Sequence, residues 1–159
     1  MESFPERPPY GSYAGIMGVF AGLLATAGAI GRLLDRDPQC QTSLDLVVLG
    51  LASFKAARTV ARDEVTSFIR QPFVRGDAHS GEGEEPVEGG MAQAIGELVT
   101  CTRCAGTWVA AGLASTQILA PRFGRLLTWS FAAAAANDFL QAGFAALKTK
   151  ANEPEGQTA

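Results

Sequence analysis

Long uncharged segments constrain this chain more than any other feature of its sequence. No charged residue occurs from Pro8 to Gly31 or from Cys104 to Pro121, and the stretch from Leu126 to Leu147 contains one, Asp138. Uncharged apolar runs of about 18 residues are typical of helices that cross a bilayer, whereas a surface helix in water repeats polar residues on one face. The sequence therefore predicts an integral membrane protein.

The predicted fold class is all-α, a bundle of about four transmembrane helices. The spans are expected at about 13–34, 43–62, 105–120 and 126–147, within a membrane domain at 13–147. The second span is the least apolar because Lys55, Arg58 and Arg62 share one helical face. It can cross only if these charges lie at its end or face the bundle interior. If it lies on the surface instead, the topology changes.

The first span contains two Gly-x-x-x-Gly pairs, built from Gly11, Gly15, Gly18 and Gly22. Small residues at this spacing allow two helix backbones to approach closely in lipid. We interpret them as the intramolecular packing face of the bundle, with a homodimer interface as the alternative.

The basic residues predict the orientation of the four spans. With the N-terminus in the cytoplasm, the tails, the central loop and the basic end of the second helix hold nine of them: Arg7, Lys55, Arg58, Arg62, Arg70, Arg75, Arg103, Lys148 and Lys150. The two outer turns hold four: Arg32, Arg36, Arg122 and Arg125. Because positive charge concentrates in cytoplasmic loops, both termini are predicted to be cytoplasmic in a multi-pass protein of the cell membrane. Cys101 and Cys104 would then face the cytosol and Cys40 the outside.

The segments outside the spans are expected to be mostly flexible. Residues 1–12 and 148–159 read as tails, and the acidic, glycine-rich stretch 76–90 as a solvated linker rather than a site. His79, within that linker, is expected to be solvated. Phe68, Ile69 and Phe73 suggest a short amphipathic segment at the membrane surface, with Pro72 ending the helix before it. A short helix is expected at 91–99.

The Cys101-x-x-Cys104 pair is the main candidate for chemistry. At the first turn of the third span, with Thr100 or Cys101 as the cap, free backbone N–H groups would stabilise a thiolate. A redox pair, a zinc site completed by a second copy of the chain, and lipidation all need such cysteines. Structural packing at the start of the helix is the remaining interpretation. Trp108, nearby, is expected to anchor the helix at the membrane surface.

Few other residues suggest a site. Asp138 lies in the middle of a predicted span, where a carboxylate marks a functional position or pairs with a base from the second helix. No Ser-His-Asp set or phosphate-binding loop is present in the sequence, which favours a protein that is not an enzyme. A net charge of −3 gives no electrostatic reason to expect a nucleic-acid partner.

Two blocks of the sequence carry a family resemblance. One is Arg62-Asp63-Glu64-Val65-Thr66 with Arg70-Gln71-Pro72-Phe73, and the other runs from Gly96-Glu97 through Cys101-Thr102-Arg103-Cys104 to Trp108. At these residues, within roughly Leu46 to Ala120, the chain resembles the DUF1360 family of small bacterial membrane proteins of unknown function. Thr102 stands where proline is expected in that family. The resemblance implies a multi-span protein without an assigned activity.

These blocks suggest one contact and one function. Arg70 and Glu97 flank the linker and are predicted to pair, which would hold the C-x-x-C beside the second helix. The favoured function is a non-enzymatic membrane scaffold or assembly partner with a cytoplasmic C-x-x-C face, without a cofactor. Its expected partners are the bilayer and a second copy or another membrane protein. The alternative is a membrane-bound thiol protein, redox-active or zinc-binding through Cys101 and Cys104.

Overall fold

Six α-helices account for most of the described residues. The computed structural model describes residues 8–36, 41–76 and 83–152, so Cys40 and His79 lie outside the described residues. The helices are α1 (Tyr10–Leu33), α2 (Ser43–Arg62), α3 (Ser67–Arg70), α4 (Gly90–Thr100), α5 (Thr102–Leu119) and α6 (Pro121–Ala151). Two 3₁₀ turns, Glu64–Thr66 and Gln71–Phe73, flank α3, and the two-residue strands β1 (Val74–Arg75) and β2 (Glu85–Pro86) pair antiparallel. The predicted all-α class is confirmed.

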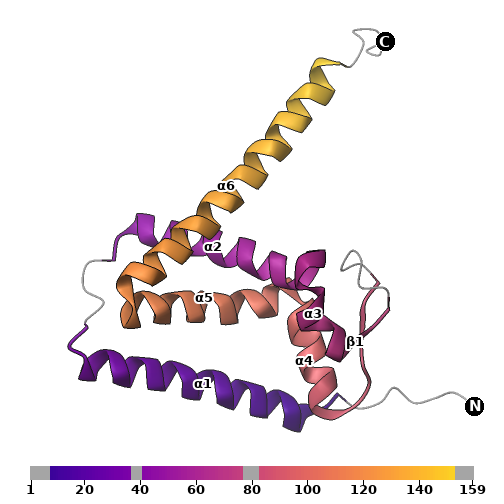
Figure 1. Ribbon diagram of the computed structural model, residues 1–159. Helices are drawn as coiled ribbons and strands as arrows, with labels where there is room; N and C mark the ends of the chain where they lie inside the picture. The colour runs from indigo at the N-terminus through magenta and orange to yellow at the C-terminus, as the bar shows by residue number, and fades with distance from the viewer. Residues whose placement is uncertain (1–7, 37–40, 77–82, 153–159) are drawn as a thin grey trace, which may run out of the picture.

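The four long helices alternate in direction along the bundle. The start of α1, the end of α2 and the start of α5 lie at one end, together with α3, α4 and β1 (Figure 1). We call this the α4 end. The short connection between α5 and α6 lies at the opposite end. The helix α6 diverges from the other three, and its C-terminal half leaves the bundle.

The core lies where α2 meets α5 and α6. Val48 and Ala52 of α2 pack there with Leu113 of α5 and Ala132 of α6. A capping box begins α2: the Thr42 hydroxyl accepts the Asp45 N–H, and the Asp45 carboxylate accepts the Thr42 N–H. Such reciprocal bonds satisfy backbone donors that have no partner within the helix.

The packing places small side chains inside and large apolar side chains outside. In the described part of the chain, eight of the ten buried apolar residues are alanines, with Val48 and Leu113 the others. Large apolar side chains stay exposed on three of the four long helices, α1, α2 and α6. Examples are Met17, Leu23, Phe54, Leu140 and Phe144. A protein that folds in water normally buries such residues.

The first helix is attached mainly through one face. Gly31 is its one buried residue, and a Cβ there would lie 2.9 Å from Ile118 Cγ2. Gly11, Gly18 and Gly22 have no described atom within 4 Å of an added Cβ. The predicted intramolecular packing face is therefore wrong for these three glycines, because α1 packs through the opposite face, which carries larger residues.

Three helix ends lie in segments that were predicted to be tail or turn. The helix α1 begins at Tyr10, inside the predicted tail. The helix α6 begins at Pro121, so the turn expected at 122–125 is helical, and it continues to Ala151, beyond the predicted start of the C-terminal tail. Proline is favoured at the first helical position, and Lys148 and Lys150 suit the negative end of the helix dipole.

One described helix, α1, is long and apolar enough to cross a bilayer by length and composition. A signal sequence near an N-terminus has the same properties. By the same criterion α2, α5 and α6 do not qualify. The charges of α2, Lys55, Arg58 and Arg62, lower its apolar character. By length and composition, one described helix and not four is therefore a candidate membrane span.

Candidate functional site

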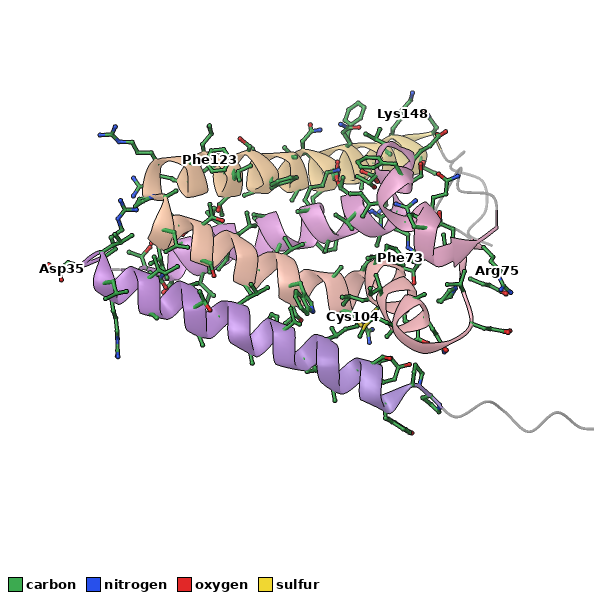
Figure 2. The ribbon with its side chains drawn as sticks, turned by 60° about the horizontal axis from the view of Figure 1, so that its bottom comes forward. Asp35, Phe73, Arg75, Cys104, Phe123 and Lys148 are labelled. Atoms are coloured by element: carbon green, nitrogen blue, oxygen red, sulfur yellow. The ribbon has the colours of Figure 1, made fainter. Side chains whose placement is uncertain are left out.

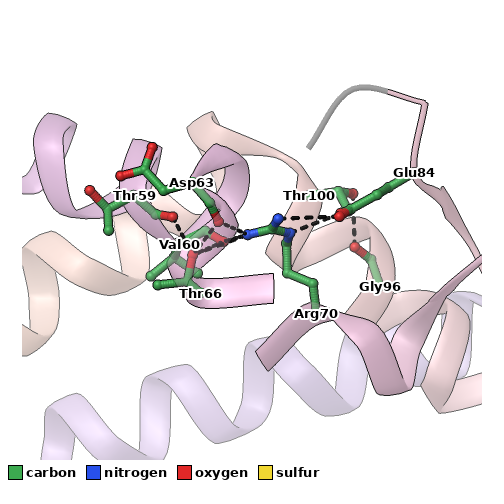
Figure 3. A network of polar contacts seen from close by, with 8 residues as sticks. All are labelled: Thr59, Val60, Asp63, Thr66, Arg70, Glu84, Gly96 and Thr100. Atoms are coloured by element: carbon green, nitrogen blue, oxygen red, sulfur yellow. Dashed lines mark hydrogen bonds and ion pairs between the residues drawn. The ribbon is translucent and has the colours of Figure 1, made fainter. Parts of the chain in front are cut away.

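A fully buried arginine organises the α4 end of the molecule. The Arg70 guanidinium, with an exposed fraction of 0%, donates from Nε to Glu84 Oε2 (2.8 Å) and from Nη2 to Glu84 Oε1 (3.2 Å). Its Nη1 donates to the carbonyl oxygens of Val60 (2.7 Å) and Asp63 (3.0 Å), at the C-terminal end of α2 (Figure 3). One cation thus joins α2, α3 and the segment that leads into β2.

Thr66 completes this network of polar contacts. Its hydroxyl accepts from Arg70 Nη1 (3.1 Å) and bonds to the carbonyl oxygens of Thr59 and Asp63. The Thr59 carbonyl also accepts the Asp63 N–H, and that of Asp63 accepts the Thr66 N–H. A cation at a helix C-terminus is favourable. The geometry describes a structural clamp that holds the chain after α2.

Two predictions about this region are wrong. Arg70 pairs with Glu84 and not with Glu97. The linker is also not solvated throughout, because the Glu84 side chain is 1% exposed and β2 pairs with β1. The sequence has five acidic residues between 76 and 90. Nothing in its local pattern distinguishes Glu84 as the one whose side chain is buried.

Phe73 and Pro72 fix the hairpin against α4. Pro72 lies in the 3₁₀ turn Gln71–Phe73. The Phe73 carbonyl accepts the Val87 N–H at 3.0 Å. It also lies 2.5 Å from where a Cβ on Gly96 would be. Gly96 is therefore required for the close approach of α4 to the hairpin, a role that the sequence alone did not indicate.

Glu97 connects α4 to α1 instead. Its carboxylate accepts from the Tyr13 hydroxyl (2.5 Å) and from Gln93 Nε2 (3.0 Å). Tyr13 was not singled out from the sequence, because a tyrosine at the start of a predicted span reads first as an interfacial residue. The contact closes one side of a cavity between α1, α4 and α5.

This cavity has a volume of about 360 Å³. Its lining is mostly apolar, and Glu97 and Cys104 reach it from α4 and α5. Trp108 forms part of the wall and contacts Phe20 of α1, with ring centroids 5.0 Å apart and planes at 62°. The membrane-surface role of Trp108 stays a prediction, while its contact with α1 is observed.

The two cysteines lie at the start of α5. Cys101 is the N-cap, as predicted, and its sulfur accepts the Cys104 N–H at 3.3 Å. Figure 2 shows Cys104 where α5 begins beside α4. Both thiols are free, with Cys101 half-buried and Cys104 exposed.

The thiols differ in acidity. A hydrogen bond from the Cys104 thiol, aided by the backbone N–H groups of Cys104 and Arg103 and the Arg103 charge, lowers the pKa of Cys101. The same hydrogen bond raises the pKa of Cys104 to about 11, and burial and the negative charges of Cys101 and Glu97 act in the same direction. Cys101 is therefore the more acidic thiol of the pair.

We expect alkylation to separate the two cysteines by pH. The Cys101 thiolate forms below the ordinary range for cysteine, whereas that of Cys104 forms near pH 11, so between these values iodoacetamide should modify Cys101 about tenfold faster or more. Peptide mass spectrometry after timed alkylation measures both rates. In Cys101→Ala the hydrogen-bond acceptor is gone, and Cys104 should react at lower pH. Equal rates in the native protein would contradict the geometry.

A metal site within one chain has no support in the described residues. They contain no group of three or more His, Cys, Asp or Glu side chains that could hold a metal ion. Zinc normally takes four ligands, so a zinc site at Cys101 and Cys104 would need two further ligands.

Asp138 pairs with a base from the second helix, as one interpretation of the sequence expected. Lys55 Nζ lies 2.7 Å from Asp138 Oδ2 and joins α2 to α6. Next to this pair, Phe54 and Phe139 stack with ring centroids 5.7 Å apart. The carboxylate therefore serves helix packing in this structure.

The fold and these contacts define a small helical protein with a buried arginine clamp and a pair of free thiols at the start of α5. The chain belongs to the DUF1360 family, described as proteins of unknown function, whose profile matches residues 48–144. That match covers α2 through most of α6, further than the predicted resemblance, and leaves α1 outside. A relative is the UPF0713 protein YngL of Bacillus subtilis (strain 168), 29% identical over 104 residues, which are 62% of this chain and 76% of YngL. No solved structure matches the chain.

Proposed function

We propose that the protein is a multi-pass membrane protein in which α1, α2, α5 and α6 all cross the bilayer, with both termini in the cytoplasm. The observation that carries the proposal is the inverted packing: alanines fill the interior, and phenylalanines and leucines cover the outside. Exposing so many large apolar side chains to water is unfavourable by about 25 cal/mol per Å². In lipid they have apolar surroundings, and small residues let helices pack closely.

The charges within the proposed spans are compatible with lipid. Lys55 and Asp138 neutralise each other across α2 and α6. Arg58 and Arg62 are exposed near the C-terminal end of α2, from where long side chains can reach the polar headgroups. Gln117 also donates to the Thr128 hydroxyl (2.7 Å), a polar contact between α5 and α6 of the kind that joins membrane helices.

The α4 end fits the cytoplasmic surface. Arg62, Arg70, Arg75 and Arg103 lie on its elements, and positive charge favours the cytoplasmic side. Near it, Val65, Phe68 and Ile69 expose apolar side chains around α3, as expected of a segment that lies on a membrane surface.

As its role, we propose a non-enzymatic scaffold or assembly partner whose contact surface is the α4 end. The Arg70–Glu84 clamp and the hairpin packed on Gly96 preform this surface, so a partner need not order it on binding. The second candidate is a thiol protein that reacts through Cys101, favoured by the lowered pKa of that thiol.

Deleting α1 tests whether the protein has four membrane-spanning helices or only one. If α2, α5 and α6 also cross, a chain that begins at Ser43 should remain in the membrane pellet after alkaline carbonate extraction. The full chain is the matched control and should also remain. Release of the shortened chain into the supernatant, with the full chain retained, would reduce the proposal to a single membrane anchor.

Metal and thiol analysis distinguishes the two candidate roles. The scaffold role predicts purified protein without stoichiometric zinc and with thiols that stay reduced under mild oxidant. Cys101→Ser/Cys104→Ser is the control that sets the background of both assays. Zinc lost in this variant, or a thiol pair that cycles between oxidised and reduced states, would favour the thiol protein.

A further inference from the structure

The cavity between α1, α4 and α5 continues along the bundle. A second cavity of about 380 Å³ lies between α1 and α5 and shares Phe20 and Trp108 with the first. Together they follow α1 from Tyr13 to Ile30, a length of about 26 Å at 1.5 Å per residue. Volumes of this size are typical of sites for small ligands.

The two cavities together form a groove along α1, and the residues that line this groove change along its length. The part toward Ile30 is lined by apolar and small residues of α1 and α5. At the α4 end the Glu97 carboxylate reaches the cavity, partly buried and bonded to Tyr13 and Gln93. Within the described residues no lysine or arginine forms an ion pair with Glu97. A carboxylate has about four acceptor positions, so it can accept further donors.

We infer that this groove binds a membrane phospholipid with a primary amine headgroup, of the ethanolamine type. The ammonium group donates to Glu97, which supplies the opposite charge, and an acyl chain lies along α1 and α5 past the Phe20–Trp108 contact. A charge-assisted hydrogen bond favours an amine over a headgroup without N–H donors. The inference rests on the proposed membrane location, since the lipid enters from the surrounding bilayer.

Trp108 provides a reporter inside the site. The chain has two tryptophans, so Trp129→Phe leaves Trp108 alone. The variant is reconstituted into phosphatidylglycerol vesicles that contain a minor fraction of lipid with brominated chains, which quench nearby tryptophan. The brominated lipid carries an ethanolamine, choline or glycerol headgroup. We expect the ethanolamine lipid to associate with Trp108 about tenfold more strongly than the other two.

Two further variants test the position of the headgroup and the chain. Glu97→Gln should reduce the preference for ethanolamine to about one, whereas the exposed Glu88→Gln should leave it unchanged. Thr107→Leu, which narrows the first cavity without altering Glu97, should weaken quenching by all three lipids. Unchanged quenching in Thr107→Leu would overturn the proposed position of the chain.

The outcomes separate this inference from the membrane proposal. Equal quenching by the three headgroups overturns the inference and leaves the membrane location intact. An unaltered preference in Glu97→Gln overturns the role of that carboxylate. If none of the brominated lipids quenches Trp108, no acyl chain lies beside it and the inference is overturned, while carbonate extraction decides the membrane location.

Discussion

Arg70→Ala is expected to destabilise the fold by about 3–5 kcal/mol, the usual effect of removing one partner from a buried ion pair. The Glu84 carboxylate would remain buried without its cation, and the carbonyl oxygens of Val60 and Asp63 would lose their donor. Arg70→Lys should also be strongly destabilising, because an ammonium group cannot reproduce the planar fork that reaches Glu84 and α2 together.

Denaturant unfolding of the purified protein in mild detergent measures this loss. Arg75→Ala is the matched control, since Arg75 is an exposed arginine on β1, and it should change stability by less than about 0.5 kcal/mol. The reversed pair Arg70→Glu/Glu84→Arg should recover part of the loss, whereas Arg70→Glu/Glu97→Arg should not. Equal stability of Arg70→Ala and Arg75→Ala would show that the clamp contributes little.

Gly96→Ala is expected to have the next largest effect, about 1–3 kcal/mol, from overpacking. The added methyl group would lie 2.5 Å from the Phe73 carbonyl oxygen and 3.1 Å from Pro86 Cβ, so α4 and the hairpin would have to separate. The pairing of β1 with β2 and the hydrogen bond from Val87 N–H to the Phe73 carbonyl hold both neighbours in place, so a shift would break these contacts.

Gly112→Ala is the control for this substitution. Gly112 lies in α5, and no described atom lies within 4 Å of an added Cβ, so the change should be neutral or stabilise the helix. Thermal unfolding of both variants in detergent makes the comparison. Gly124→Ala should resemble Gly96→Ala, because its Cβ would lie 2.5 Å from the backbone nitrogen of Gln117. A Gly96→Ala protein as stable as Gly112→Ala would contradict the close packing of α4.

The helices could be predicted from the sequence because their signals are local. Long apolar runs predicted the four long helices with bounds at most five residues from the observed ones, and Thr100 or Cys101 was expected as the cap of α5. The contact of Asp138 with α2 followed from the high energy of an isolated charge in an apolar segment.

The site could be predicted only in part because its contacts span the chain. Arg70 and Glu97 were singled out from the sequence, but their observed partners, Glu84 and Tyr13, were not predicted. Glu84 is one of several acidic residues, and Tyr13 lies 84 positions before Glu97. The exposure of Gly11, Gly18 and Gly22 on α1 was also not predicted. Their spacing shows that they share one helix face, but it does not show whether that face contacts another helix.

If four helices cross the membrane as proposed, the C-x-x-C pair lies in the cytoplasm. Thiol labelling from each side of the membrane tests this topology most directly. Cys40→Ser leaves Cys101 and Cys104 as the only thiols, and Cys101→Ser/Cys104→Ser leaves Cys40. A membrane-impermeant maleimide is applied to intact and to opened spheroplasts. We predict that Cys101 and Cys104 react only after opening and that Cys40 reacts from outside. Reaction of Cys101 and Cys104 in intact spheroplasts, or of all three cysteines only after opening, would contradict this topology.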